Sequence, residues 1–239
     1  MRSIYAFNGD ADGLCALQQL LLAEQFAGAE LVTGPKRRID LLKQVHAGAG
    51  DRVTVLDLSF RSNADAVIRL LAAGARVRYF DHHHAGELPA HPGLEAYVDT
   101  SAQICTSAIV DRYLAGAQRA WAVVGAFGDN LPGTAASLAA GAGLSRDELP
   151  ALERLGVALN YNAYGETEDD LFFPPKELHL RLAAYRDPRD FVASDEAFRV
   201  LCGGYDSDLR RAAALLPAHA SPHAALYALP QARWARRVS

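Results

Sequence analysis

The chain has 239 residues, half of them hydrophobic and 22% charged, which is typical of one large globular domain or of a domain with an appendage. Its formal net charge of −4 excludes the global positive field that holds a long nucleic acid. Three widely spaced cysteines form no CxxC pair and indicate no disulfide framework. With no secretory signal pattern and no apolar run that could span a bilayer, we expect a cytoplasmic protein without a membrane partner.

Residues 1–100 alternate between strand-like and helix-like patterns. Strand-like apolar runs fall at residues 3–7, 29–34, 52–59, 77–80 and 95–99. Helical spacing lies between them, at residues 13–26, 39–46 and 63–74. In the last of these helices we expect Asn63 to be the N-cap and Gly74 to end the helix. Apolar strands that alternate with helices predict an α/β fold, with a doubly wound and mainly parallel sheet flanked by helices.

From residue 101 onward the patterns are almost entirely helical. They cover residues 101–117, 119–130, 134–143 and 147–165, and they resume after residue 175. The stretch 166–175 combines acidic residues, aromatic residues and prolines, which indicates a linker or a domain border. We therefore expect an N-terminal domain over 1–165 and an all-helical region over 166–239. We expect that region to be too small for a core of its own, and we interpret it as a helical linker and the start of a truncated substrate-binding domain.

Acidic and imidazole side chains fall at the ends of the predicted elements. They follow the first strand (Asp10, Asp12), the third (Asp57), the fourth (Asp81, His82, His83) and a very apolar helix (Asp129). Ligands of open parallel sheets collect at the carboxyl ends of the strands, so these side chains are candidates for one common site.

Five carboxylates that converge on one edge repel one another strongly in a low-dielectric setting, and cations must neutralise them. Carboxylates together with imidazole suit Mn²⁺, Mg²⁺, Fe or Co better than structural zinc. A single ion needs fewer anionic ligands, which favours two ions that share one bridging carboxylate. Paired ions about 3.5–4 Å apart serve hydrolytic phosphoryl transfer.

Structural interpretations compete with this one at several positions. Asp10 and Asp12 could build only an Asx-type turn, and Asp129 could be a helix-end residue bound to the backbone. We interpret His84 as part of a solvated loop. The basic patch at 35–38 could attract phosphate or be ordinary surface, and the hydroxyls of 101–110 could touch substrate or cap a helix.

Together, D-x-D-G after the first strand, an Asp after a hydrophobic strand, D-H-H at a strand end and a later G-D resemble the DHH phosphoesterases. This family includes RecJ-like exonucleases, nano-RNA and pAp phosphatases, cyclic-dinucleotide phosphodiesterases and family II pyrophosphatases. The resemblance covers about residues 1–165, which it identifies as the catalytic domain, and it fades afterwards. One departure is Asn8, which stands where many relatives have His or Asp and offers a neutral, weaker ligand.

The resemblance also implies a role for each motif residue. Asp10 would hold a first metal ion, and Asp57 would bridge it to a second ion held by Asp12, His82 and Asp129. His83 would lie near the scissile phosphate and stabilise charge on its oxygens. Asp81 would orient His82 or fix the loop. The candidate substrate contacts are Asn8, His83, Arg37 and Arg38.

The sequence thus predicts a metal-dependent phosphoesterase in which two divalent ions activate water. Mn²⁺ is the expected ion, with Mg²⁺ or Co²⁺ as alternatives, and the expected substrate is a short oligonucleotide or a small nucleotide. One alternative is a haloacid-dehalogenase-like phosphatase with Asp57 as nucleophile, although Ser59 stands where that scheme needs a second acid. The other is a metal- or nucleotide-binding sensor derived from such an enzyme. The oligomeric state is not predicted.

Overall fold

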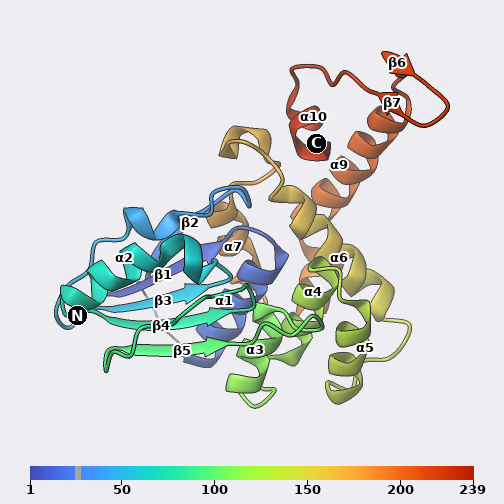
Figure 1. Ribbon diagram of the computed structural model, residues 1–239. Helices are drawn as coiled ribbons and strands as arrows, with labels where there is room; N and C mark the ends of the chain where they lie inside the picture. Colours follow the sequence, from blue (N-terminus) through green and yellow to red (C-terminus); the bar gives the residue numbers. More distant parts are fainter. Residues whose placement is uncertain (25–27) are drawn as a thin grey trace.

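A computed structural model of the chain describes residues 1–24 and 28–239. Its larger sheet has five strands, all parallel, in the order β2-β1-β3-β4-β5 (Figure 1). The strands are β1 (Ser3–Asn8), β2 (Glu30–Gly34), β3 (Arg52–Leu56), β4 (Arg76–Asp81) and β5 (Leu94–Val98). The predicted parallel α/β sheet is therefore confirmed.

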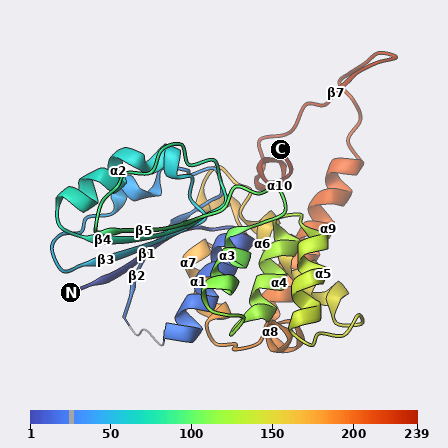
Figure 2. The same cartoon turned by 60° about the horizontal axis from the view of Figure 1, so that its bottom comes forward.

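Helices cover both faces of this sheet. Figure 2 shows α2 (Phe60–Ala72) on one side, and α1 (Ala11–Glu24) and α3 (Thr106–Tyr113) on the other. Successive side chains of a strand point to opposite faces. Along β1, Tyr5 and Phe7 accordingly pack in the apolar cluster that contains α1, and Ile4 and Ala6 pack in the cluster that contains α2. Both faces of β1 are thus buried, which explains the unbroken apolar run in the middle of this strand.

The rest of the chain is helical apart from one small hairpin. Its elements are α4 (Arg119–Gly128), α5 (Pro132–Gly141), α6 (Leu149–Asn162), the 3-10 turn η2 (Glu168–Asp170), α7 (Pro175–Leu182), α8 (Pro188–Ser194), α9 (Glu196–Ala213), the antiparallel strands β6 (His219–Ala220) and β7 (Ala225–Leu226), and α10 (Arg233–Val238). The hairpin projects away from the sheet (Figure 1). Within the described ranges, every helix is too short or too polar to cross a membrane.

The C-terminal helices share a core with the N-terminal part of the chain. Leu178, Phe191 and Leu201 belong to the same apolar cluster as the residues of α1. Gln18 of α1 also donates hydrogen bonds from its side chain to the carbonyls of Leu182 (3.2 Å) and Tyr185 (3.0 Å). A domain boundary near residue 165 remains a prediction.

Two predicted helices differ from the structure. The helix expected over 39–46 is only a four-residue 3-10 turn, η1 (Leu41–Gln44), after which Val45 returns to extended backbone. The helix expected over 63–74 begins earlier, at Phe60, so Asn63 is not its N-cap. Asn63 is instead buried within α2, where its side chain donates to the carbonyl of Ile39 (2.8 Å) and accepts from the N–H of Leu42 (3.3 Å). This residue therefore holds the loop of η1 against the helix.

Two other helix ends can be compared with the prediction. Gly74 follows α2 with φ of +85°, a left-handed conformation that glycine adopts easily, and it ends the helix as predicted. The helix expected over 13–26 begins at Ala11, and residues 25 and 26 of that prediction lie outside the described residues.

Burial of His179 predicts that the protein loses stability in mild acid. The ring lies edge-on to Phe7 with 6.2 Å between ring centroids, and burial lowers the pKa of His179 to about 4. The unfolded chain takes up this proton below about pH 6.5, whereas the folded protein takes it up only near pH 4, so stability falls as the pH drops between these values. We expect the free energy of unfolding to fall by about 2 kcal/mol more in the wild type than in His179→Leu between pH 7 and pH 5.

Urea unfolding of both proteins at the two pH values measures this difference. His84→Gln, a change at an exposed histidine, is the control and should follow the wild type. Equal losses in wild type and His179→Leu would contradict the assignment to His179.

Candidate metal centre

The tight turn between β1 and α1 places two buried carboxylates at the carboxyl edge of the sheet. Asp10 accepts a hydrogen bond from the N–H of Gly13 at 3.1 Å. Gly13 must be glycine here, because a Cβ atom would collide with the carbonyl of Asn8. Asp12 lies in the first turn of α1 and points away from that helix toward the N-terminus of α3. There it accepts from the N–H groups of Thr106 and Ser107, both at 2.7 Å, so its position is fixed.

Asp57 directly follows β3 in a left-handed conformation, with φ of +57°. Such a conformation is uncommon for residues other than glycine, but Asp and Asn tolerate it better than most. The N–H of Asp57 still donates to the carbonyl of Phe80 on β4 (3.0 Å), and the Thr106 hydroxyl donates to its Oδ1 (3.2 Å). The side chain is 3% exposed, which makes Asp57 a buried carboxylate at the centre of the strand ends.

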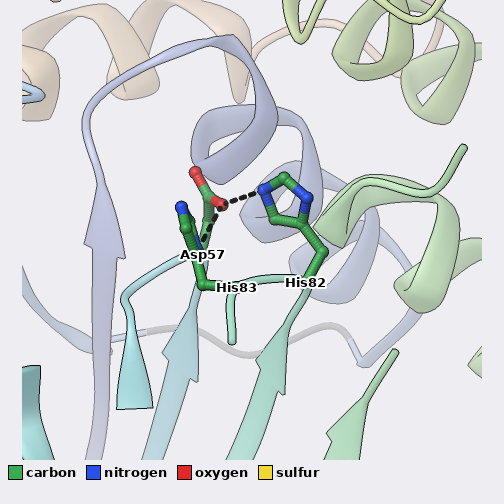
Figure 3. Close-up of side chains that lie close together, drawn as sticks. All are labelled: Asp57, His82 and His83. Atoms are coloured by element: carbon green, nitrogen blue, oxygen red, sulfur yellow. Dashed lines mark ion pairs between the residues drawn. The ribbon is translucent and has the colours of Figure 1, made fainter. Parts of the chain in front are cut away.

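The two histidines after β4 turn toward Asp57 (Figure 3). Nδ1 of His82 lies 3.1 Å from the carbonyl oxygen of Ile104, and its Nε2 lies 3.4 Å from Oδ1 of Asp57. When Nδ1 carries the proton and donates it to Ile104, the lone pair of Nε2 faces the carboxylate cluster. Nδ1 of His83 lies 3.9 Å from the same Asp57 oxygen.

Asp81 contacts His83 rather than His82, which differs from the expected orienting role. Its Oδ1 lies 2.7 Å from Nδ1 of His83, and its Oδ2 accepts from the N–H of Phe60 at 3.3 Å. Residues 81 and 83 are two positions apart at the end of β4 and their side chains meet directly, whereas the ring of His82 contacts the carbonyl of Ile104. The alternative expectation, that Asp81 fixes the loop, agrees with both contacts.

Asp129 brings a fourth segment to the cluster from the end of α4. Its Oδ2 lies 3.8 Å from Nδ1 of His82. Asp12, His82 and Asp129 each offer a potential ligand atom within 4.8 Å of the others, and so do Asp57, His82 and His83. The structure therefore brings together side chains from four distant segments of the chain.

The carboxylates of this cluster repel one another electrostatically. Burial raises the pKa of Asp57 well above its usual value, and the neighbouring charges of Asp10, Asp12, Asp81 and Asp129 raise it further. Burial, followed by the charge of Asp12, raises the pKa of Asp129 to about 6, against the lowering effect of His82. The hydrogen bond to Asp81 raises the pKa of His83, which favours its positive form. Around Asp57, the negative charges nevertheless outnumber the positive ones.

Lys36 is a member of this site that the sequence did not single out. Its Nζ lies 2.6 Å from Oδ2 of Asp10. Burial acts to raise the pKa of Asp10, but Lys36 outweighs it, and the net pKa is lowered. Lys36 follows β2, which pairs with β1, and so the two loops meet at the sheet edge. The sequence position alone did not reveal this, since Lys36 belongs to a basic patch that resembles ordinary surface.

The remaining sequence candidates have different surroundings. Oδ1 of Asn8 is buried and has no hydrogen-bond partner among the described residues. Arg37 and Arg38 are exposed and line a pocket of about 530 Å³ together with Glu166 and Glu168. Among the described residues, neither arginine forms an ion pair with the carboxylate cluster. His84 is exposed in its loop, as interpreted from the sequence.

The donor set fits a divalent cation. Buried carboxylates that raise one another's pKa need positive charge, and carboxylate oxygens with an imidazole nitrogen are the ligands of Mn²⁺ and related ions. The outer contacts also agree with a metal site, because Ile104 orients His82 and the N-terminus of α3 orients Asp12. Asn8 adds an unpartnered buried oxygen beside the same turn, among the residues that the structure describes.

Comparison with solved structures shows that the chain has the fold of DHH proteins. It is similar to the exonuclease RecJ bound to manganese, with a TM-score of 0.56 and 17% identity over 88% of this chain and 63% of that one. RecJ from Thermus thermophilus in complex with Mn²⁺ has a TM-score of 0.54 and 18% identity, over 88% and 36% of the two chains. A DHH domain described as a member of a family of ribosomal proteins has a TM-score of 0.54 and 14% identity, over 87% and 58%.

The resemblance to the DHH family is thereby confirmed at the level of the fold. This chain spans less than two thirds of the length of each of these structures. No family model matches the sequence, and no curated protein matches it.

Because negative charges surround Asp57, we expect that replacing it with the neutral asparagine stabilises the metal-free protein. Asp57→Asn keeps the left-handed backbone and the acceptor for Thr106 but removes the buried charge. We expect the free energy of unfolding in chelator to rise by about 1–3 kcal/mol, the order of the cost of a buried polar group without adequate partners. Added Mn²⁺ should stabilise the wild type and should have a much smaller effect on the variant.

Thermal and urea unfolding with chelator and with Mn²⁺ test this expectation. Asp65→Asn, which neutralises an exposed carboxylate on α2, is the control and should change neither stability nor the Mn²⁺ effect. A destabilised Asp57→Asn protein in chelator would show that the Asp57 charge is compensated within the protein.

Proposed function

We propose that this chain is a metal-dependent phosphoesterase of the DHH type, which hydrolyses a phosphoester or phosphoanhydride bond by attack of water. The observation that carries the proposal is the convergence of Asp12, Asp57, His82 and Asp129 on one buried site with too little positive charge. The shared fold with manganese-bound RecJ structures supports it. In this proposal residues 1–165 contain the catalytic machinery.

The ligands of one cation would be Asp12, Asp57, His82 and Asp129. In the two-ion arrangement expected from the sequence, Asp10 and Asp57 would hold the other, with Mn²⁺ as the preferred ion and Mg²⁺ or Co²⁺ as alternatives. When bound, divalent cations would neutralise the carboxylates, attract phosphate oxygens and lower the pKa of the attacking water.

The surrounding residues would keep the ligands in place for this chemistry. Ile104 accepts from Nδ1 of His82 and leaves Nε2 directed at Asp57. The N–H groups of Thr106 and Ser107 hold both oxygens of Asp12. Preorganised ligands of this kind need little rearrangement when substrate binds.

His83 is the side chain best suited to contact the substrate. Its ring faces Asp57, and 42% of its side chain is exposed, so a phosphate can reach it. The hydrogen bond to Asp81 raises its pKa and favours the imidazolium. A positive charge there would stabilise the negative charge that grows on the phosphate oxygens during attack.

The charge distribution favours a small phosphorylated substrate or a short oligonucleotide. The chain carries a net charge of −4, and the pocket beside Arg37 and Arg38 is also lined by Asp40, Glu166 and Glu168. A long single strand needs a continuous positive groove with stacking aromatics. Three carboxylates outnumber the two arginines in this pocket, so it offers no such groove, and a substrate with few phosphates is favoured.

Hydrolysis of bis-p-nitrophenyl phosphate with added Mn²⁺ tests the proposed function. We expect activity that chelator abolishes, that Asp57→Asn loses, and that falls about 10²-fold in kcat in His83→Ala because one charge-stabilising donor is removed. His84→Ala, a change at the exposed neighbour, is the control and should retain full activity. A panel with a nucleoside bisphosphate, a short labelled oligonucleotide and a long single strand then defines the substrate class.

Two outcomes would favour the other functions. Nucleotide binding without turnover on the whole panel would favour a sensor. A covalent phosphate trapped on Asp57 with Mg²⁺ would favour a dehalogenase-like phosphatase and contradict attack by water.

A further inference from the structure

Both oxygens of the buried Asp10 carboxylate already have a partner within the chain. Oδ1 accepts from the N–H of Gly13 at 3.1 Å, and Oδ2 lies 2.6 Å from Nζ of Lys36. Asp10 is 1% exposed, so solvent contributes little to the balance of its charge. The lysine ammonium is therefore the main counter-charge of this carboxylate.

Other groups hold the Lys36 ammonium where it is. Oδ1 of Asn160 accepts from Nζ at 3.1 Å, and Nζ lies 5.6 Å from the centroid of the Tyr164 ring. The backbone N–H of Lys36 donates to the carbonyl of Ala163 at 3.0 Å. The end of α6 and the residues after it thus fix both the backbone and the side chain of Lys36, in contrast to an ordinary surface lysine.

Asp10 does not belong to either group of side chains that lies close enough to share a metal ion. The two sets with ligand atoms close enough to share an ion are Asp12, His82 and Asp129, and Asp57, His82 and His83, and neither contains Asp10. The other side chain at the turn, Asn8, is a neutral amide whose buried Oδ1 has no partner among the described residues. A second dication held by Asp10 and Asp57 would lie beside the ammonium of Lys36, which already balances the charge of Asp10, and the two positive charges would repel each other at close range.

We propose that the ammonium of Lys36 takes the place of one cation at Asp10, so that the chain binds a single divalent ion, held by Asp12, Asp57, His82 and Asp129. This inference rests on the proposed function only in requiring that one ion binds. A fixed lysine would then supply permanently the positive charge that a second ion supplies reversibly.

The number of bound ions tests the inference without any measurement of hydrolysis. The metal-free chain is titrated with Mn²⁺ by calorimetry, and bound metal is counted by elemental analysis after equilibrium dialysis. We expect one ion per chain in the wild type and two in Lys36→Met, which keeps the length of the side chain but removes its charge. Lys43→Met is the matched control, because Lys43 is exposed and pairs with Asp40 at 3.0 Å on the surface, and it should bind one ion.

Each other result has a definite meaning. Two ions in the wild type, or one ion in Lys36→Met, would overturn the inference and leave the proposed function standing. No bound ion in the wild type would overturn both. If Lys36→Met does not fold, Asp10→Asn decides: the inference requires one ion in this variant, and a variant that binds none would show that Asp10 is a ligand.

Discussion

Electrostatic repulsion among buried carboxylates at the carboxyl edge of the sheet is the constraint on which this structure depends. Asp10, Asp12, Asp57 and Asp129 lie close enough that burial and mutual charge raise the pKa of Asp57 and of Asp129. A fold without a use for such a cluster would gain stability by replacing it with neutral side chains. The protein instead holds Asp10, Asp12 and Asp57 by hydrogen bonds, which directs their charges toward a common point.

The parallel sheet makes this convergence possible. Strands β1, β3 and β4 are neighbours with the same direction, so the residues that follow them meet at one edge although long helices separate them in the sequence. The N-terminus of α3 closes the arrangement from another side, where its free N–H groups hold Asp12 and the Thr106 hydroxyl reaches Asp57. Rigid elements thus place every member of the site.

Charge compensation in the site is uneven. Asp10 has a lysine held by α6, and Asp81 has an imidazole that its own hydrogen bond makes more basic. Among the described residues, the hydrogen-bond donors to Asp12 are backbone N–H groups, and the Asp57 carboxylate accepts from the Thr106 hydroxyl while several negative neighbours surround it. The deficit of positive charge is therefore greatest around Asp57, between Asp12 and His82. A cation would gain most electrostatic energy there.

The sequence by itself determined the parallel α/β sheet, because apolar runs bounded by helical spacing depend on local periodicity. It also determined that acids and imidazoles follow the strands, since their positions can be counted along the chain. Only the tertiary structure decided the partners. Asn63 is not a helix cap but forms a buried hydrogen bond to the loop of η1. Asp81 contacts His83 rather than His82. Lys36 reaches Asp10 because β2 lies beside β1. Contacts of this kind depend on strand order and side-chain direction, which no local pattern of residues contains.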